Sequence, residues 1–235
     1  MEYAIIFLPL LGSIISGFFG KSIGNKYTQI LTSSLVAISA VLSLLIFYKV
    51  LVENYSSNKL IFNWINSGNF SVNWSIYIDP LTSVMLVVVS LVSSIIHFYS
   101  IGYMSHDPHK SRFMSYLSLF TFAMLTLVSA DNFLQLFFGW EGVGLCSYLL
   151  IGFWYKKPAA NAAAIKAFIV NRVGDFGFAI GIFLIFFYYG TVNYNEVFSQ
   201  TVDLSQKEII FFGIQFNLIT LICLLLFVGS MGKSA

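Results

Sequence analysis

The chain has 235 residues, of which 58% are hydrophobic and 9% are charged, and its formal net charge at pH 7 is +2. Soluble domains carry about 25% charged residues, so this composition excludes a soluble enzyme, a disordered tail and a nucleic-acid-binding protein with a basic face. The two cysteines lack CxxC spacing and indicate neither a disulfide framework nor a zinc site. The sequence therefore predicts an integral membrane protein.

Seven stretches are long and apolar enough to cross a bilayer. A hydrocarbon core about 30 Å thick needs about 20 mainly apolar residues in a helix, and helices satisfy their own backbone groups in lipid. The predicted spans are approximately Tyr3–Gly20, Ile30–Val52, Leu81–Tyr103, Phe113–Ser129, Asn132–Trp154, Ile165–Tyr189 and Ile209–Met231. We expect an all-α, polytopic transmembrane helix bundle of about seven spans.

The loops between these spans differ in charge. Seven of the twelve basic residues lie in or beside the first, third and fifth loops, namely Lys21, Lys26, Lys110, Arg112, Lys156, Lys157 and Lys166. The other side of the bundle holds three bases and seven of the ten acids, namely Glu2, Glu53, Asp79, Asp131, Glu196, Asp203 and Glu208. Because cytoplasmic loops are enriched in Lys and Arg, the N-terminus is predicted to lie outside.

One loop predicts strands. From Phe70 to Ile78 apolar and polar residues alternate, which is the period of a half-buried strand. Leu60–Ile65 is a second β-prone run, and residues 66–69 between the two runs are turn formers. We predict a β-hairpin over residues 60–78 on the outer face.

Charged residues deep in the predicted spans are costly and are functional candidates by default. Glu141 lies near the middle of the fifth span and has no basic neighbour in sequence; desolvation favours its uncharged form, so it suits a proton carrier that a mobile cation visits. A structural, hydrogen-bonded glutamate is the alternative. Asp175 lies near the middle of the sixth span, and Arg172 three residues earlier lies on the same helical face, which fits either a structural salt bridge or an ion pair that tunes neighbouring carriers.

Two further residues have two interpretations each. Lys233 ends the seventh span and fits either a functional cation or a lysine that reaches the inner interface. His97 in the third span fits either a packing residue or a proton relay. Several motifs of soluble catalysis are missing, since the sequence has no GxGxxG, GxxxxGK[ST] or HExxH. A bundle with buried charges favours ion or proton translocation over a purely structural membrane subunit.

The segment Trp140–Trp154, WEGVGLCSYLLIGFW, resembles the signature of chain 5 of proton-pumping NADH:quinone oxidoreductase, respiratory complex I. Lys166–Phe168 with Asn171–Gly177 resembles the next span of that family, and Gly232–Ala235 resembles the start of its long central motif. The hairpin with Ile78–Leu81, and His97–Ser100 with Tyr103 and Met104, resemble its N-terminal module. The resemblance covers essentially the whole chain.

The resemblance implies an antiporter-like bundle in which Glu141 and Lys233 are the coupled charges of a proton half-channel. It implies an N-terminal module at 1–130 and the start of the proton-translocating module at 131–235. Because the family is about twice this length or more, we expect an N-terminal fragment that lacks the family's later histidines, second lysine and lateral helix.

The resemblance also implies the surroundings of the chain. Its partners would be the lipid bilayer and other membrane subunits of complex I, including a neighbouring antiporter-like subunit, and no nucleic acid. The membrane would be a bacterial or a mitochondrial inner membrane. NADH, FMN, iron–sulfur clusters and quinone would bind in partner subunits, because this chain has no ligand set for redox groups. The alternative family is the large subunit of a multisubunit cation/proton antiporter.

Overall fold

The helices begin and end where the sequence supplies capping residues. The Asp79 carboxylate accepts a hydrogen bond from the Thr82 N–H at 2.6 Å, and Pro80 occupies the first position of helix α3 (Pro80–Tyr103), where a missing N–H costs nothing. The Asn132 side chain caps α5 (Phe133–Ile151) in the same way by accepting from the Gln135 N–H at 2.8 Å. Gly190 has a φ of +70° and ends α6 (Pro158–Tyr189), a conformation that favours glycine.

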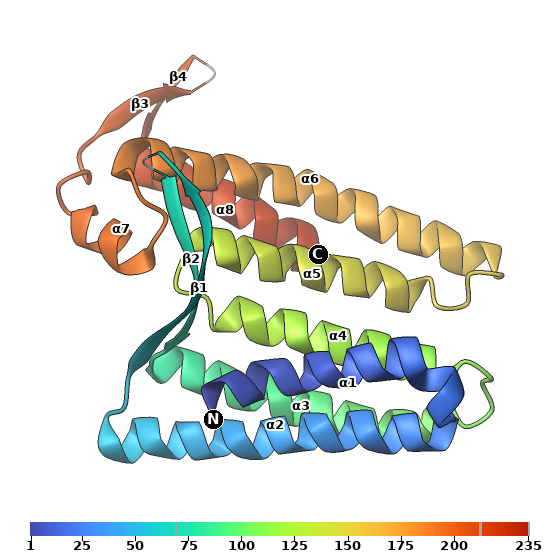
Figure 1. Ribbon diagram of the computed structural model, residues 1–235. Coiled ribbons are helices and arrows are strands. Elements are labelled where there is room, and N and C mark those ends of the chain that lie inside the picture. The colour runs from blue at the N-terminus through green and yellow to red at the C-terminus, as the bar shows by residue number, and fades with distance from the viewer. Residues whose placement is uncertain (69, 212, 235) are drawn as a thin grey trace.

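The computed structural model describes residues 1–68, 70–211 and 213–234 (Figure 1). Its elements in chain order are α1 (Glu2–Ile23), α2 (Asn25–Glu53), β1 (Ser57–Ser67), β2 (Phe70–Ile78), α3 (Pro80–Tyr103), α4 (Lys110–Val128), α5 (Phe133–Ile151), α6 (Pro158–Tyr189), α7 (Tyr194–Gln200), β3 (Glu208–Phe211), β4 (Ile214–Asn217) and α8 (Leu218–Ser234). Six of the described helices, α1 to α6, are long and apolar enough to cross a membrane. The predicted multi-pass helical architecture is confirmed.

The prediction of a seventh span over Ile209–Met231 is wrong at its start. Residues 208–217 form a small antiparallel hairpin of β3 and β4, so α8 begins only at Leu218 and has 17 residues. Gly213 has a φ of +80° between the two strands, and the Asn217 side chain accepts hydrogen bonds from the N–H groups of Ile219 and Thr220 at the start of α8. The apolar run therefore contains a turn former and a helix cap that divide it.

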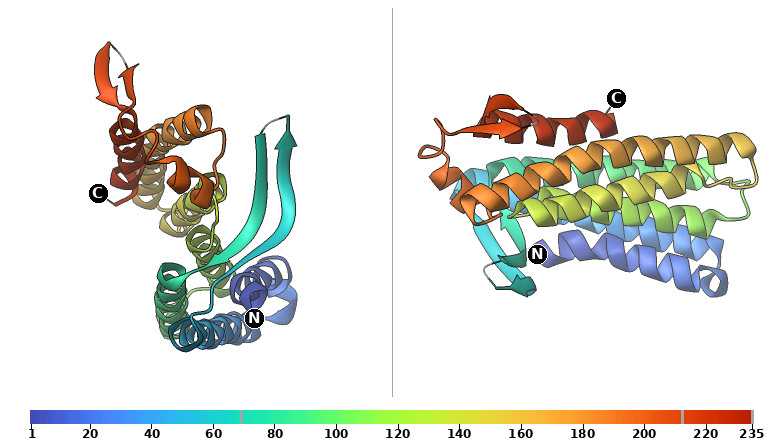
Figure 2. Two further views of the ribbon diagram at one scale, coloured as in Figure 1. Left: turned by 90° about the vertical axis from the view of Figure 1, so that its left-hand side faces the viewer. Right: turned by 90° about the horizontal axis from the view of Figure 1, so that it is seen from above.

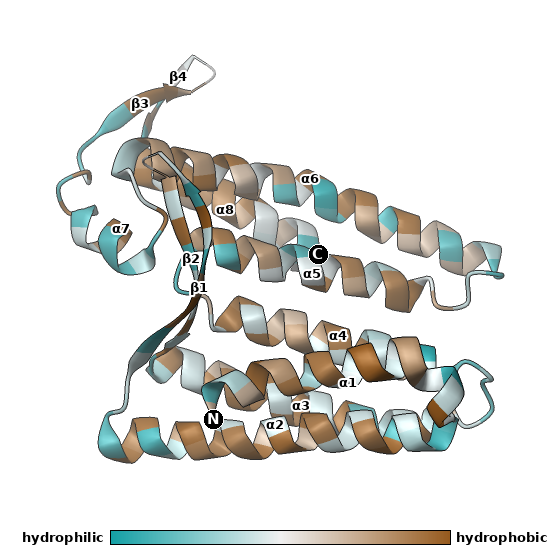
Figure 3. Cartoon of the chain, in the orientation of Figure 1, coloured by the Kyte–Doolittle hydropathy of each residue, from teal (hydrophilic) through white to brown (hydrophobic). Residues whose placement is uncertain are grey.

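The long helices run antiparallel in sequence order. Helices α1 to α4 pack on one another, α5 packs on α4, α6 packs on α5, and α8 packs on α6 (Figure 2). The helices are composed mainly of hydrophobic residues (Figure 3), and they carry exposed rings such as Phe18, Phe183 and Phe187. We call the end that carries β1, β2 and the N-terminus the hairpin end. The opposite end, which holds the α1–α2, α3–α4 and α5–α6 loops and the seven basic residues named above, is the basic end.

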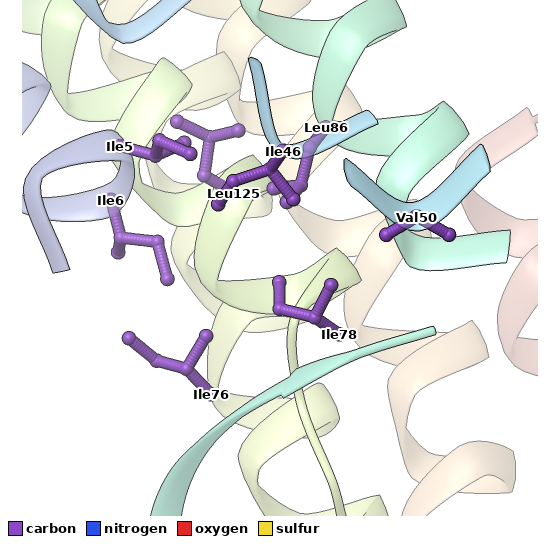
Figure 4. Close-up of a cluster of buried hydrophobic side chains, with 8 residues drawn as sticks. All are labelled: Ile5, Ile6, Ile46, Val50, Ile76, Ile78, Leu86 and Leu125. Atoms are coloured by element: carbon purple, nitrogen blue, oxygen red, sulfur yellow. The ribbon is translucent and has the colours of Figure 1, made fainter. Parts of the chain in front are cut away.

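The predicted hairpin is confirmed, and its first strand is longer than the sequence indicated. Strands β1 and β2 pair antiparallel from Ser57 opposite Ile78 to Ser67 opposite Phe70; the predicted turn includes residue 69, which lies outside the described residues. The base of β2 packs into the four-helix part, where Ile76 and Ile78 join a cluster with Ile5, Ile6, Ile46, Val50, Leu86 and Leu125 (Figure 4). The other end of β2 places Val72 in a cluster with Phe178, Ile182 and Val192. The hairpin therefore connects α1–α4 with α6.

A side-chain amide fixes this hairpin to α5. Gln135 is 1% exposed, its Nε2 donates to the Ser75 carbonyl at 2.7 Å, and its Oε1 accepts from the Ser75 N–H at 3.0 Å. The amide therefore substitutes for a neighbouring strand. Ser75 is buried for this reason, although the alternation of β2 predicts an exposed position.

We expect Gln135→Leu to destabilise the folded protein by about 2–3 kcal/mol, because it leaves two buried backbone groups without partners at about 1–3 kcal/mol each. The measurement is the thermal midpoint of the purified full-length protein. Gln200→Leu, at the exposed end of α7, is the matched control. Equal midpoints for Gln135→Leu and the wild type would show that this amide does not hold the hairpin.

Candidate functional site

Glycines at the helix crossings bring α5, α6 and α8 close together. A Cβ atom on Gly174 would lie 3.0 Å from the Gly232 Cα and 3.2 Å from the Gly229 carbonyl oxygen, so α6 and α8 approach through their backbones. A Cβ atom on Gly144 of α5 would lie 2.8 Å from the Lys233 Nζ. These contacts place Glu141, Arg172, Asp175 and Lys233 in one group, which we call the charge cluster.

Glu141 has a basic partner that the sequence did not reveal. Its Oε2 accepts a hydrogen bond in an ion pair with the Arg172 Nη2, across the interface of α5 and α6. Its Oε1 is buried and has no hydrogen-bond partner among the described residues. The expectation of an isolated carboxyl is therefore wrong, because the rotation of α6 about its axis turns Arg172 toward α5.

Asp175 is the most buried acid of the cluster, with a side chain that is 4% exposed. The predicted pairing with Arg172 is present at 3.8 Å between Nη2 and Oδ2, but Arg172 lies closer to Glu141. The Trp140 indole Nε1 donates to the Asp175 Oδ1 at 2.7 Å. The Asp175 carboxylate therefore contacts both a guanidinium and an indole N–H.

Lys233 lies inside the bundle and not at an interface. Its Nζ is 3.9 Å from the Asp175 Oδ1, donates to the Trp140 carbonyl and lies 5.0 Å from the centre of the Trp140 ring. The side chain is 13% exposed, so Lys233 packs against α5 and α6 and does not extend along the surface as the alternative of an interfacial lysine expects.

The cluster is balanced in charge and is open on one side. Two carboxylates face two cations, so the fully ionised group has no net charge. The Arg172 side chain is 43% exposed near the middle of α6, whereas that of Glu141 is 23% exposed. A charged side chain facing hydrocarbon is costly, by about 2.5–3.5 kcal/mol on insertion scales, so Arg172 requires a polar or protein covering.

Trp140 is the member of this site that sequence reasoning missed. It contributes both its carbonyl, to Lys233, and its indole N–H, to Asp175, and its ring stacks on Phe178 at 5.2 Å. A buried indole N–H normally has a hydrogen-bond partner, so a tryptophan next to a mid-span glutamate is the signal that indicates such a role.

His97 lies in a different part of the bundle, between α3 and α4. It is fully buried, its Nδ1 lies 2.8 Å from the Ser93 carbonyl, and its Nε2 lies 3.1 Å from the Ser118 hydroxyl. The Ser93 hydroxyl is in turn 2.5 Å from the Thr121 hydroxyl. His97 is thus a satisfied member of a hydroxyl-rich interface, and its hydrogen bonds do not connect it to the charge cluster.

Among the residues that the structure describes, no group of three or more His, Cys, Asp and Glu side chains is arranged to hold a metal ion. The site places two carboxylates beside two cations, an arrangement that suits uptake and release of a proton by an acid. Glu141 is the acid with the more exposed side chain, and Asp175 is the acid held by more donors.

The sequence matches two protein-family models. Residues 64–114 match the model described as NADH-ubiquinone oxidoreductase (complex I), chain 5 N-terminus, and residues 130–235 match the model described as NADH:quinone oxidoreductase/Mrp antiporter, TM. The first matched region begins within β1 and includes β2, and the second contains the charge cluster.

Two curated relatives match nearly the whole chain. NADH-quinone oxidoreductase subunit L of Rickettsia felis is 56% identical over 231 residues, which cover 98% of this chain, and NADH-ubiquinone oxidoreductase chain 5 of Chondrus crispus is 52% identical over 235 residues, which cover all of it. The chain spans 35% of the length of each of these relatives.

Two solved structures share the fold. The Mrp complex from Dietzia sp. has a TM-score of 0.82 at 21% identity, and the alignment covers 100% of this chain and 24% of that one. The archaeal membrane-bound sulfane sulfur reductase has a TM-score of 0.78 at 15% identity, over 99% of this chain and 34% of that one. The solved structures therefore show the antiporter-like fold. The sequence identities are higher to subunit L and chain 5 of NADH:quinone oxidoreductase than to these two structures. Together these matches establish that the chain belongs to the chain 5 (subunit L) family of NADH:quinone oxidoreductase, respiratory complex I.

Proposed function

We propose that this chain is the proton-translocating part of a membrane subunit of NADH:quinone oxidoreductase, and that Glu141 takes up and releases the transported proton. The observation that carries the proposal is the charge cluster, in which two acids and two cations from three helices meet inside the bundle. Electron transfer from NADH to quinone would take place in other subunits, with NADH, FMN, iron–sulfur clusters and quinone bound there.

Arg172 would couple the two acids. Its guanidinium pairs with Glu141 and lies 3.8 Å from the Asp175 Oδ2, so protonation of Glu141 leaves Asp175 as its remaining acidic neighbour. Two unit charges 4 Å apart interact by about 4 kcal/mol at an effective dielectric constant of 20. Moving one charge against a membrane potential of 100 mV costs about 2.3 kcal/mol. The interaction energy that changes when Arg172 exchanges one acid for the other is therefore large enough to load and unload a proton.

Lys233 would set the second state of the cluster. It lies against Asp175 and the Trp140 carbonyl, and a shift of its flexible side chain toward Glu141 would favour release of the proton from that carboxyl. Such a shift changes the distances from the Lys233 ammonium group to the two carboxylates and to Arg172 without moving a helix. We propose that redox reactions in partner subunits drive this shift.

Gly144 provides the space for the Lys233 ammonium group. We expect Gly144→Ala to lower NADH-driven proton translocation about threefold, because the new Cβ would lie 2.8 Å from Nζ and displace it from Asp175. The folded protein is expected to remain stable, since the flexible end of a lysine moves more easily than a backbone. The measurement is proton translocation by the assembled complex in vesicles.

The control for this variant is Gly102→Ala, since a Cβ on Gly102 of α3 meets nothing within 4 Å. It should translocate protons as the wild type does. Unchanged translocation by Gly144→Ala would contradict the role of the Lys233 position.

The distribution of charge supports an orientation with the basic end inside and the hairpin end, with the N-terminus, outside. The multi-pass bundle would then lie in a bacterial or a mitochondrial inner membrane. The partially exposed Arg172 supports a further protein surface over α6, which we assign to the rest of the longer protein or to a neighbouring antiporter-like subunit. We further propose that residues 1–130 and 131–235 form two modules and that His97 relays protons within the first.

A cation/proton antiporter subunit is the second candidate, and the likeness to the Mrp complex supports it. Its 21% identity, against 52–56% for the subunit L and chain 5 relatives, favours the first proposal. Affinity purification of the full-length tagged protein separates the two. We expect an NADH-oxidising assembly that contains iron–sulfur clusters; an assembly of antiporter subunits without NADH oxidation would contradict the proposal.

A further inference from the structure

A cavity of about 380 Å³ lies at the basic end, outside the charge cluster. It is enclosed by the start of α4, the end of α5, the loop that follows and the start of α6. Its polar wall includes Arg112, Tyr155 and Asn161, and its apolar wall includes Leu149 and Ile165. A cavity with one polar and one apolar wall at the end of membrane-spanning helices lies at the depth of lipid headgroups.

Arg112 is held in place at this cavity and keeps a buried donor without a partner among the described residues. Its Nη2 donates to the Phe153 carbonyl at 3.1 Å, and the guanidinium carbon lies 4.6 Å from the centre of the Phe153 ring and 5.3 Å from that of Tyr155. Its Nε is buried and has no hydrogen-bond partner among the described residues. A buried N–H without a partner is costly, so this donor favours an acceptor from outside the chain.

A second cavity, of about 410 Å³, lies on the other side of Arg112 and also includes Tyr116. Lys21 and His109 contribute to its wall. The described residues that line the two cavities include no aspartate or glutamate. The cavity walls around Arg112 therefore carry basic side chains and no carboxylate, so a ligand that fits these walls is an anion.

One carboxylate, that of Asp107, lies near this region, and both of its oxygens accept hydrogen bonds from groups other than Arg112. The Asp107 Oδ1 accepts from the His109 N–H at 2.7 Å, and its Oδ2 accepts from the Trp154 Nε1 at 3.0 Å. Burial opposes the charged form of Asp107, but these hydrogen bonds, with smaller electrostatic contributions from His109 and Arg112, outweigh it and hold the pKa of Asp107 below its usual range. Asp107 therefore stays ionised and orients the loops, and it makes no hydrogen bond to the Arg112 Nε.

We propose that this cavity binds the phosphate headgroup of an anionic phospholipid, with the Arg112 guanidinium as the principal ligand. Tyr155 and Asn161 would donate further hydrogen bonds, and one acyl chain would lie along Leu149 and the exposed Ile165. Guanidinium groups bind phosphate oxygens through charge-assisted hydrogen bonds, and the apolar wall favours a lipid over free phosphate. The lipid would join α4, α5 and α6 at the basic end, whether or not the cluster carries protons.

The test uses the full-length protein in its purified complex, stripped of lipid by detergent exchange and then returned to bilayers. Phosphatidylglycerol in a phosphatidylcholine background is compared with phosphatidylcholine alone, and bound lipid is counted by native mass spectrometry. We expect specific retention of phosphatidylglycerol, and about tenfold weaker retention in Arg112→Gln, since charged hydrogen bonds are about twice as strong as neutral ones. Lys26→Gln removes an exposed charge at the same end and should bind as the wild type does.

A second measurement on the wild type keeps the proposal testable if Arg112→Gln fails to assemble. A photoactivatable phosphatidylglycerol with the reactive group in its acyl chain should label the segment 148–165. Labelling elsewhere, equal binding of both lipids, or equal retention by Arg112→Gln and Lys26→Gln would overturn the proposal. Full displacement of the lipid by inorganic phosphate would identify free phosphate as the ligand and would also overturn it.

Discussion

Glu141→Gln is expected to lower NADH-driven proton translocation by about threefold to tenfold, an increase of about 0.7–1.4 kcal/mol in the limiting barrier. The amide keeps the shape of the carboxyl but cannot exchange a proton, and Arg172 loses its closest anion. Because the guanidinium still has Asp175 at 3.8 Å, the complex is expected to assemble. The measurements are proton translocation and NADH oxidation by the same reconstituted complex.

Glu196→Gln is the matched control for this prediction. This variant makes the same change from glutamate to glutamine, but at an exposed position of α7 outside the spans. It should leave both activities unchanged. Wild-type translocation in Glu141→Gln would contradict the carrier role.

Asp175→Asn is expected to destabilise the protein by about 3 kcal/mol, since removing one partner of a buried ion pair leaves an uncompensated charge. Asp175 is the acid that Lys233, Arg172 and the Trp140 indole share. With Asn at this position Lys233 has no carboxylate at ion-pair distance in the charge cluster. The measurement is the thermal midpoint of the purified complex, with Asp203→Asn on an exposed loop as control.

The double variant Asp175→Asn with Lys233→Gln tests whether this loss arises from charge. It restores the balance of the cluster, because Glu141 and Arg172 remain as one pair. We expect the double variant to be less destabilised than the sum of the two single variants by about 1–3 kcal/mol. Additive effects would mean that Asp175 and Lys233 do not interact.

Local patterns in the sequence predicted most of the fold. The alternation of Phe70–Ile78 predicted β2, and six long apolar runs predicted α1 to α6, because burial and backbone satisfaction in lipid leave few other structures. The β3–β4 hairpin was missed because its residues continue the apolar run of α8. Gly213 and Asn217 are the signals that mark this division.

The sequence predicted which residues form the charge cluster, but it did not predict which acid pairs with which cation. The spacing of Arg172 and Asp175 places them on one helical face, which local geometry fixes. The contact between Arg172 and Glu141 depends on how α6 is rotated against α5, and that rotation follows from packing at the helix crossings, such as Gly174 against α8. The position of Lys233 likewise depends on where α8 begins, which the β3–β4 hairpin decides.

The central claim is that the Glu141 carboxyl gains and loses a proton while the complex turns over. Infrared difference spectroscopy of the assembled complex during NADH oxidation measures this directly through the carbonyl stretch of protonated carboxyls. We expect a reversible carboxyl signal that disappears in Glu141→Gln and persists in Glu196→Gln. A difference spectrum that is identical in the wild type and in Glu141→Gln would show that this acid keeps one protonation state throughout the cycle.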